Sequence, residues 1–298
     1  MLIHEIVEFC NSEYRNADTT HVCRDCNHPS KCSGSCKNCL EQVHFPSKYS
    51  NGKIDYDCEN MINFYVCDYI NKYASEMLYL LRKSEKLKEI DEYHILSIGC
   101  GAAPDLMAFE QYVRETDPSK RISYLGFDIN NLWKPVHDKI DEYNCSEIIK
   151  TRFKYEDVIQ FFDDRTVKEA NVIVLQYVIS HFYNTEQINR IKKFFSDLIK
   201  NVVELKDNKK PFIILINDVN SYKRGRNFFM DSVEALKSHH FHGQCRCFYF
   251  DYKLKDDGQR YGDKHPKNNT LFDLSEFDLK QYEPWEYCSS AQMLIEIE

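Results

Sequence analysis

No long hydrophobic run occurs in this sequence, and that absence argues against an integral membrane protein. A helix that crosses a bilayer needs about 20 consecutive apolar residues, and no apolar segment of the 298-residue chain approaches that length. The N-terminus also lacks the lysines and the apolar stretch of a secretory signal and has acidic residues instead. We therefore expect a folded, cytoplasmic protein that has no membrane partner.

Positive charge is also scarce. Lys and Arg total 39 against 47 Asp and Glu, so the formal net charge is -8 at pH 7, which argues against a basic nucleic-acid coat protein. The 13 cysteines, in a chain without a recognisable secretory signal, indicate a reducing compartment. In such a compartment clustered thiols hold metal more often than they form disulfides.

Five cysteines gather in the segment CRDCNHPSKCSGSCKNC, residues 23–39. The spacings C-x2-C and C-x3-C-x2-C bring thiolates together on one ion, and the surrounding polar residues offer no apolar periodicity that would bury them instead. We predict a structural zinc site, with an iron-sulfur cluster as the alternative. The simplest ligand set is Cys23, Cys26, Cys36 and Cys39. The residues that can replace one of these or serve a second site are Cys32, His21, His28, His44, Cys10 and Cys58.

Residues 56–90 carry apolar side chains at helical spacing. The positions concerned are Ile62, Val66, Tyr69, Tyr73, Met77 and Leu80 or Leu81. We predict a long amphipathic helix packed on the following domain. Its tyrosines are interpreted as core residues, and a stripe for base stacking is the alternative.

After residue 90, strand patterns alternate with helical patterns. The predicted strands cover 95–98, 124–128, 151–155, 172–178, 212–218, 245–252 and 292–298, and the predicted helices 104–115, 132–143 and 186–205. Such alternation predicts an α/β fold, a parallel sheet with helices on both faces. The predicted organisation is therefore a cysteine-rich zinc-binding module (1–54), a linking helix (55–90) and a doubly wound domain (91–298).

Ligands of such sheets bind at the carboxyl ends of the strands, so the residues that follow the strands form the candidate site. In IGCGAAPD, Gly99 and Gly101 let the backbone turn tightly and approach a ligand closely. Asp128 ends the second strand, where a carboxylate can accept both hydroxyl protons of a ribose. The pair Glu156-Asp157 follows the third strand, where it can meet an exocyclic amine.

These motifs resemble those of the class I S-adenosylmethionine-dependent methyltransferases over about residues 91–298. IGCGAAPD is similar to their glycine-rich first motif, GFDIN to the ribose-binding motif, YEDV to the adenine-edge acidic position and VLQYVISHF to the fourth strand. The resemblance implies a seven-stranded sheet whose last strand, QMLIEIE, inserts antiparallel next to the fifth. The implied cofactor-binding residues are Gly99, Cys100, Gly101, Ala103, Asp105, Asp128, Ile129, Asn130, Glu156, Asp157 and Gln176.

Two positions depart from the family pattern. Ser97 stands where the family often has an acid that supports the ammonium group of the methyl donor, and we expect Asp105 to compensate. Ala103 stands at the third glycine, where a small residue still fits. Pro104 occupies the last glycine position of the dinucleotide motif G-x-G-x-x-G and lacks an N–H, which argues against a dehydrogenase.

Methyl transfer is an in-line displacement, so positioning supplies most of the catalysis, and a base helps only when the acceptor loses a proton. The candidate catalytic residues are His181 and Tyr177, after the fourth strand, and Asp218, after the fifth. His181 can equally be a hydrogen-bonded residue at the start of a helix, and Asp218 can equally cap a turn. The Asn- or Asp-Pro-Pro-aromatic motif of many base-amine methyltransferases is absent.

The predicted function is an S-adenosylmethionine-dependent methyltransferase that acts on RNA, with S-adenosylmethionine and zinc as cofactors. Two basic stretches favour an anionic partner: residues 21–53, and Lys223, Arg224 and Arg226 after the fifth strand, although both can be solvated loops. One alternative is a methyltransferase acting on a small molecule or protein. The other is a catalytically weak regulatory protein that binds the cofactor and docks a protein partner through its zinc module.

Overall fold

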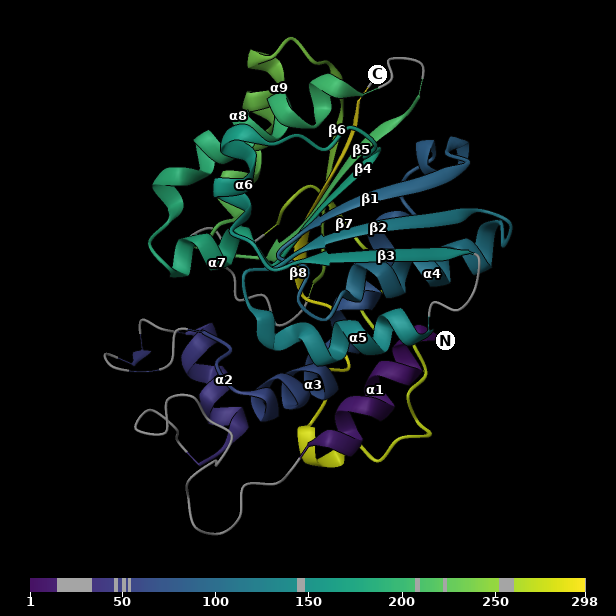
Figure 1. Ribbon diagram of the computed structural model, residues 1–298, viewed down its shortest axis with the longest axis vertical. Helices are drawn as coiled ribbons and strands as arrows, with labels where there is room; N and C mark the ends of the chain where they lie inside the picture. The colour runs from purple at the N-terminus through teal and green to yellow at the C-terminus, as the bar shows by residue number, and fades with distance from the viewer. Residues whose placement is uncertain are drawn as a thin grey trace.

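The computed structural model describes residues 1–14, 34–45, 48–49, 52, 55–143, 148–206, 210–221, 224–251 and 260–297. In these ranges an eight-stranded mixed sheet carries helices on both faces (Figure 1). The strands are β1 (Glu92–Ile98), β2 (Arg121–Phe127), β3 (Ile149–Lys154), β4 (Val172–Gln176), β5 (Phe212–Val219), β6 (Gly243–Tyr249), β7 (Asp263–Lys264) and β8 (Ser290–Ile297). The α-helices are α1 (Leu2–Glu13), α2 (Cys36–His44), α3 (Glu59–Leu81), α4 (Pro104–Thr116), α5 (Lys134–Tyr143), α6 (Val158–Asp164), α7 (Ile179–Asn184), α8 (Ile191–Asn201) and α9 (Phe229–Ser238).

The strand order is β3-β2-β1-β4-β5-β8-β6-β7. Strands β1 to β5 are parallel, and β8 is antiparallel to its neighbours β5 and β6. The α/β prediction and the predicted insertion of the last strand beside the fifth are confirmed. The sheet has one strand more than the seven predicted, because the two-residue β7 adds to its edge beside β6, and so short a segment carries no periodicity.

Alternate residues of the central strands face two separate cores. Val172 and Val174 of β4 pack with α1, α3, α4 and α5, whereas Ile173 and Leu175 pack with α6, α8 and α9. Burial on both faces explains why the central strands read as continuous apolar runs in the sequence.

The predicted helices are largely present. Residues 104–116 form α4, and the 3-10 helix at Asn131–Trp133 leads directly into α5. The helix predicted at 186–205 is wrong in its extent, because α7 precedes it and two 3-10 turns, at Ile188–Arg190 and Val203–Leu205, flank a shorter α8. No helix in the described ranges is long and apolar enough to cross a membrane.

The long helix predicted within 56–90 is α3, which ends at Leu81 and is followed by a 3-10 helix at Lys86–Glu89. It shares one apolar core with α1, α2, α4 and the sheet. Leu2, Ile6 and Cys10 of α1 are fully buried in that core. The core therefore runs across the predicted boundaries at residues 54 and 90.

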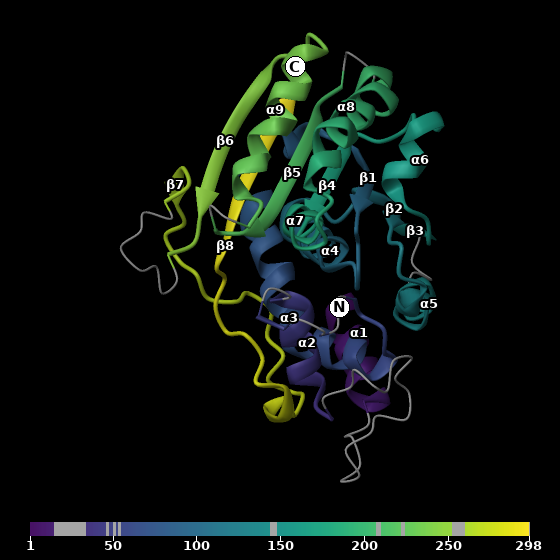
Figure 2. The ribbon, with the colours of Figure 1, turned by 90° about the vertical axis from the view of Figure 1, so that its left-hand side faces the viewer.

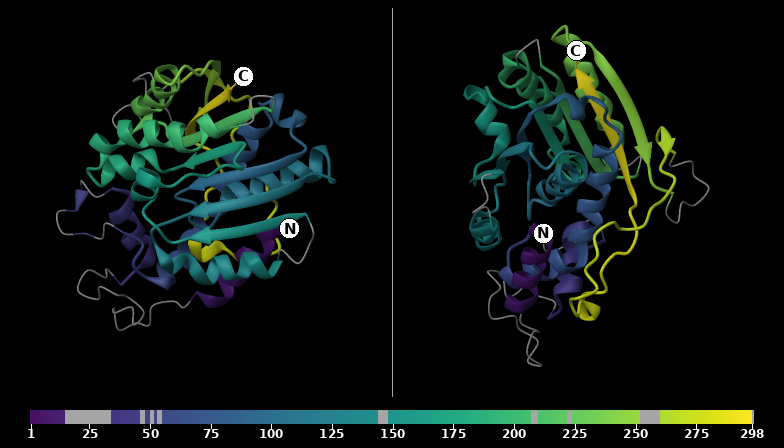
Figure 3. Two further views of the ribbon diagram at one scale, coloured as in Figure 1. Left: turned by 45° about the horizontal axis from the view of Figure 1, so that its top comes forward. Right: turned by 90° about the vertical axis from the view of Figure 1, so that its right-hand side faces the viewer.

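The segment between β7 and β8 runs along α3 to the N-terminal helices and back to the sheet, as the yellow trace in Figures 2 and 3 shows. The Asn71 side chain donates to the Phe272 carbonyl at 2.9 Å, and the backbone N–H of Trp285 donates to the Asp68 carbonyl at 3.1 Å. A further 3-10 helix lies at Lys280–Tyr282. These bonds hold Trp285 beside α3, at the edge of the sheet where β8 begins.

Candidate functional site

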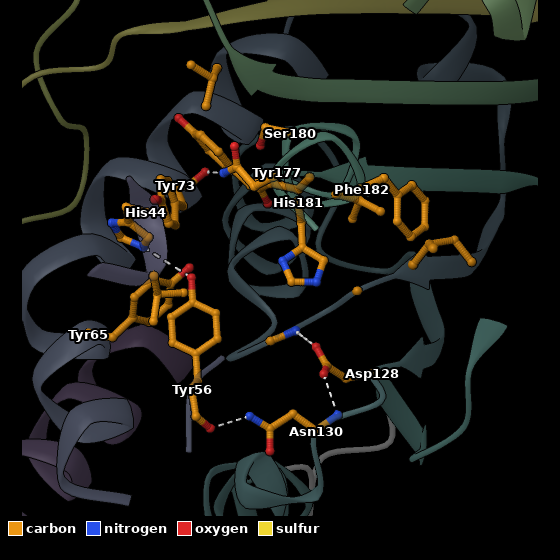
Figure 4. Close-up of a pocket in the computed structure, with 18 of the residues that line it drawn as sticks. His44, Tyr56, Tyr65, Tyr73, Asp128, Asn130, Tyr177, Ser180, His181 and Phe182 are labelled. Carbon is orange, nitrogen blue, oxygen red and sulfur yellow. Dashed lines mark hydrogen bonds between the residues drawn. The ribbon is translucent and has the colours of Figure 1, made fainter. Parts of the chain in front are cut away.

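A cavity of about 410 Å³ opens at the carboxyl ends of β1, β2, β3, β4 and β5. Residues that follow each of these strands line it, together with residues of α2, α3 and α7 and of the segment before β8. Its volume lies within the range of small-molecule sites, and its place at the strand ends is where doubly wound sheets bind ligands. The cavity is therefore the candidate site (Figure 4).

The turn after β1 has a left-handed backbone at three positions. Gly99 has φ +62°, Gly101 φ +49° and Ala103 φ +55°. A Cβ on Gly99 would lie 2.8 Å from a methyl carbon of Val178, and one on Gly101 would lie 3.6 Å from the Trp133 ring. The two glycines therefore let the backbone itself form the wall of the cavity, and the positive φ at Ala103 is a conformation that glycine adopts more readily than alanine.

Asp128 is the carboxylate at the end of β2. One of its oxygens accepts from the backbone N–H of Gly101 and the other from the backbone N–H of Asn130, both at 2.9 Å. Burial raises the pKa of this carboxyl to about 6. Asn130 in turn donates to the Tyr56 carbonyl at 2.6 Å. Asp128 thus joins the glycine turn to the loop after β2 and faces the cavity (Figure 4).

The acidic pair after β3 also lines the cavity. Asp157 caps α6 by accepting from the backbone N–H of Ile159 at 2.9 Å, and Glu156 pairs with Arg165 at 2.7 Å. Ile129 directly follows Asp128 in the chain. It is a large apolar residue, yet 65% of its surface is exposed. The loops after β2 and β3 therefore present carboxylates beside an uncovered apolar surface.

Eight of the eleven predicted cofactor-binding residues line the cavity. They are Gly99, Gly101, Asp128, Ile129, Asn130, Glu156, Asp157 and Gln176. Cys100, Ala103 and Asp105 do not line it and lie behind the turn, where all three are buried. Asp105 accepts from the Tyr124 hydroxyl at 2.9 Å, and burial raises its pKa to about 6. The expected compensation for Ser97 by Asp105 is therefore wrong, because its carboxyl is turned into the layer between α4 and the sheet.

His137 holds the glycine turn from behind, a role that the sequence did not indicate. Its Nε2 donates to the Gly101 carbonyl at 2.7 Å, which leaves Nδ1 to accept from the Tyr155 hydroxyl at 2.8 Å. Its ring stacks on Phe153 with 3.8 Å between centroids. Burial lowers the pKa of His137 to about 4, so the ring is neutral near pH 7.

A row of tyrosines forms one wall of the cavity. Tyr65, Tyr69 and Tyr73 of α3 stack at centroid distances of 5.3 and 5.4 Å, and Tyr73 reaches Tyr177 at 4.2 Å. Tyr56 packs on Tyr65 at 5.1 Å. All five line the cavity. The interpretation of the helix tyrosines as core residues is therefore incomplete: their four-residue spacing was the available signal for one shared face.

The predicted catalytic residues separate into two groups. His181 extends into the cavity between the tyrosine wall and Asp128 (Figure 4). Burial lowers the pKa of its imidazole, so one ring nitrogen is free of a proton near neutral pH. Asp218 does not line the cavity: it accepts from the backbone N–H of Ser180 at 3.0 Å and caps the start of α7. Its assignment as a catalytic residue is therefore corrected to a structural one.

Tyr177 has φ +57°, an uncommon backbone conformation for an aromatic residue. Its backbone N–H donates to the Asn217 carbonyl at 2.8 Å, and its hydroxyl donates to Glu76 at 2.8 Å. Burial and the neighbouring Glu76 raise the phenol pKa well above its ordinary value. The hydroxyl therefore keeps its proton, and the ring serves as a wall of the cavity.

The predicted metal site lies mostly outside the described residues, which include neither Cys23, Cys26 nor Cys32. Cys36 and Cys39 are buried one turn apart on α2. Within the described part of the chain, no group of three or more His, Cys, Asp or Glu side chains is arranged to hold a metal ion. His44, an alternative ligand, instead lines the cavity, and its Nε2 lies 3.1 Å from the Tyr56 hydroxyl.

No family model matches the chain, and no curated protein does. Solved structures similar to it include three methyltransferases. The bifunctional kinase-methyltransferase WbdD has TM-score 0.42 and 11% identity over 97% of this chain and 45% of that one. Precorrin-6y C5,15-methyltransferase from Geobacter metallireducens GS-15 has TM-score 0.40 and 12% identity over 76% and 87%. The plantazolicin methyltransferase BpumL, in complex with SAH, has TM-score 0.40 and 16% identity over 87% and 95%. The chain thus spans less than half of WbdD, and scores this low assign no activity to it.

Proposed function

We propose that this protein is an S-adenosylmethionine-dependent methyltransferase. The observation that carries the proposal is the convergence of the glycine turn after β1, Asp128 after β2 and the acidic pair after β3 on one cavity. A bare strand-to-helix turn needs the glycines, but it does not need carboxylates from two further strands beside them. Together these groups match the parts of a nucleoside linked to an amino acid.

The residues of the cavity fit this cofactor. Gly99 and Gly101 would take its amino-acid part, Asp128 the ribose hydroxyls, and Asp157 or Glu156 the adenine amine. The exposed side chain of Ile129 offers an apolar surface for the adenine ring. When bound, the cofactor would supply an electrophilic methyl group on a sulfonium.

Gln176 has an acceptor oxygen for the ammonium group of the cofactor, a role that Ser97 and Asp105 do not fill. Its Nε2 donates to the Tyr73 carbonyl at 2.8 Å, while its Oε1 is buried and has no hydrogen-bond partner among the described residues. A buried acceptor without a partner costs roughly 1–3 kcal/mol, so a donor group of the ligand at this place would be stabilising. We assign Gln176 Oε1 to the ammonium group of the cofactor.

His181 is the candidate general base. It is the imidazole that extends into the cavity nearest Asp128 (Figure 4), and its lowered pKa leaves a nitrogen able to accept a proton from the acceptor near neutral pH. The tyrosine wall would exclude water from the same space. Replacement by glutamine should lower the rate of transfer and leave the affinity for the cofactor unchanged.

Two experiments test the proposal. Isothermal titration calorimetry with S-adenosylmethionine should show binding to the folded protein, and no heat at millimolar cofactor would overturn the proposal. Transfer of labelled methyl from the cofactor to RNA, protein and small-metabolite extracts would then separate an enzyme from a binding protein. Incorporation into any fraction excludes the regulatory alternative in its pure form.

We propose RNA as one class of methyl acceptor. Fewer of the predicted basic residues support it than the sequence indicated. Arg224 lines the cavity, where a guanidinium can contact phosphate. Arg226 is only 7% exposed and donates to the Asn220 side chain at 2.7 Å, so it is not available to an anionic partner as predicted. Lys223 lies outside the described residues. A small or protein acceptor remains the alternative that the extract assay addresses.

Zinc remains a proposal that rests on the cysteine spacing. The C-x-x-C pair of α2, Cys36 and Cys39, lies on one face of that helix, as two ligands of a tetrahedral site require. Such a site would be structural, because four protein ligands leave no coordination position for chemistry. A protein partner docking on this segment is proposed on the same basis.

A further inference from the structure

The two ends of the cavity differ in charge. The acidic side chains that line it are Asp55, Asp128, Glu156 and Asp157. Asp55 acts electrostatically on both Asp128 and His181, which places it with the carboxylates of β2 and β3. The lysine and arginine that line the cavity are Lys72, on α3, and Arg224, after β5. The carboxylates that line the cavity therefore lie at the end assigned to the cationic cofactor, whereas its lysine and arginine come from α3 and from the loop after β5.

Lys72 is a buried ammonium in an aromatic enclosure. Its side chain is 7% exposed. Its Nζ lies 4.5 Å from the centroid of the Trp285 ring, 5.3 Å from that of Tyr73 and 5.5 Å from that of Tyr177. Within the ranges that the structure covers, the ammonium makes no hydrogen bond to another residue. The Lys72 ammonium therefore lines the cavity beside three aromatic rings, with no acceptor at hydrogen-bond distance among the described residues.

Glu76 balances the charge of Lys72 but cannot satisfy its donors. The two groups approach only to 4.0 Å, and Glu76 is fully buried. Four other donors already fill its carboxylate: the Tyr177 hydroxyl at 2.8 Å, Asn217 Nδ2 at 3.1 Å, and the backbone N–H groups of Ser289 at 2.8 Å and Ser290 at 3.2 Å. These contacts anchor Glu76 to β5 and to the start of β8. Its negative charge therefore compensates the buried charge of Lys72, but it accepts no hydrogen bond from the ammonium.

A second donor without a partner lines the same cavity. Asn220, after β5, is 6% exposed, and its Oδ1 accepts from Arg226 at 2.7 Å. Its Nδ2 is buried and has no hydrogen-bond partner in the described part of the chain. Donors on α3 and after β5 that lack acceptors indicate a ligand with a negatively charged oxygen group, because burying such donors unpaired is costly.

We propose that the end of the cavity formed by Lys72, Tyr73, Tyr177 and Trp285 is an acceptor subsite for a small, flat, aromatic anion such as an aryl carboxylate. The proposal rests on the proposed function, since it names the substrate class of the same site. The ring lies against the aromatic side chains, and its anionic oxygens accept from the Lys72 ammonium. Aromatic side chains favour a planar ligand through stacking, and the buried cation selects a negative one over neutral or cationic rings of the same shape.

The two tryptophans of the chain make this subsite directly observable. The protein has only two, Trp133 and Trp285, and both line the cavity. Trp133 lies beside Gly101 at the cofactor end, and Trp285 lies beside Lys72. The variant Trp133→Phe therefore has a single fluorophore at the proposed subsite, and Trp285→Phe has a single fluorophore at the cofactor end.

The experiment titrates full-length Trp133→Phe with benzoate, benzamide and benzamidine, which share one shape and differ in charge. Benzoate should change the Trp285 emission and bind at least roughly 10-fold more tightly than the other two. Adding Lys72→Met, which keeps an unbranched side chain of similar size and removes the charge, should weaken the binding of benzoate by roughly 10- to 100-fold. Lys88→Met is the matched control, because Lys88 is an exposed residue that pairs with Glu85 on the surface.

Each result decides the proposal. Equal binding of the three probes, or benzoate binding that survives Lys72→Met, overturns it. A short single-stranded oligoribonucleotide that changes the Trp285 emission when benzoate does not would also overturn it, in favour of RNA. If Lys72→Met does not fold, the charge selectivity of Trp133→Phe decides the matter alone.

A second titration, with a cofactor product, distinguishes a failure of the proposed subsite from a failure of the proposed methyltransferase function. S-Adenosylhomocysteine is titrated into Trp285→Phe and followed by Trp133. Cofactor binding without benzoate selectivity refutes the subsite and leaves the methyltransferase proposal standing. Benzoate selectivity without cofactor binding refutes the methyltransferase proposal and leaves an anion site.

Discussion

Replacing Asp128 by asparagine should weaken the binding of S-adenosylmethionine while leaving the fold intact. The carboxylate accepts backbone N–H groups from Gly101 and Asn130, both at 2.9 Å, and thereby sets the distance between the two loops that face the cofactor. Asparagine keeps one acceptor oxygen, but its amide NH2 must face one of these N–H groups. One loop therefore loses its anchor, and the ribose hydroxyls lose a charged acceptor.

The expected size of the effect follows from the bonds lost. A hydrogen bond to a charged group contributes about 1.5–3 kcal/mol, so the affinity should fall roughly 10- to 100-fold. Global stability should change much less. Burial raises the Asp128 pKa from 3.8 to about 6, so the ionised carboxyl costs the folded state about 3 kcal/mol near neutral pH. Its removal offsets the lost bond, and the unfolding free energy should shift by less than about 2 kcal/mol.

Calorimetric titration with S-adenosylmethionine near neutral pH measures the affinity, and urea unfolding measures the stability. The matched control is Asp138→Asn, on α5, where an exposed carboxylate pairs with Lys134. That variant should bind like the wild type. A Kd for Asp128→Asn within twofold of the wild-type value would refute the assignment of this carboxylate to the cofactor.

Four further outcomes are expected. Glu76→Gln should lower the unfolding free energy by about 3–5 kcal/mol in urea, because an amide cannot accept all four bonds that converge on this buried group; a loss below about 1 kcal/mol would contradict its anchoring role. The Asp105 pKa is raised from 3.8 to about 6, so its contribution to stability is full below the lower value and is lost as pH rises through the upper one. Relative to wild type, the free energy of unfolding of Asp105→Asn should therefore rise by up to about 3 kcal/mol between acid and neutral pH. A difference between the two proteins that stays constant over this pH range would contradict the raised pKa of Asp105. His181→Gln should lower labelled methyl transfer while the calorimetric Kd stays the same, and unchanged transfer would remove His181 as the base. Freshly purified, reduced protein should contain zinc by elemental analysis; absence of metal would refute the cysteine site, and a brown colour would favour iron-sulfur.

Most strands of the sheet were predictable because the sequence patterns that indicate them span only a few residues. Strand β4 is buried on both faces, so it reads as a continuous apolar run, and the glycines at 99 and 101 mark the turn that follows β1. The carboxylate at 128 was predictable for the same reason, since it follows a strand directly. Strand β7 has two residues and pairs with β6 at the sheet edge, so its existence depends on a neighbour rather than on its own sequence.

The assignments that failed concern the direction in which a side chain points. Asp105 and Asp218 stand near strand ends, as cofactor or catalytic carboxylates would, yet one bonds Tyr124 and the other caps α7. Neighbouring residues of a turn point to opposite sides of the sheet edge. The type of a residue does not reveal to which side its side chain points. Cys100 was misassigned for this reason too, because its thiol packs against Gly126 behind the turn.

The strand segments, the glycine turn and the acids after β2 and β3 were predictable from the sequence alone, because hydrophobic periodicity and turn chemistry act over a few residues. Only the tertiary structure decided what faces them. It brings the tyrosines and Lys72 of α3, Asn220 after β5 and Trp285 before β8 to one cavity, although long stretches of chain separate them. The physical reason is packing: α3 must bury its apolar side against α4 and the sheet, and the segment before β8 is bonded along α3. The aromatic end of the cavity, with Lys72 in it, is a consequence of those two contacts.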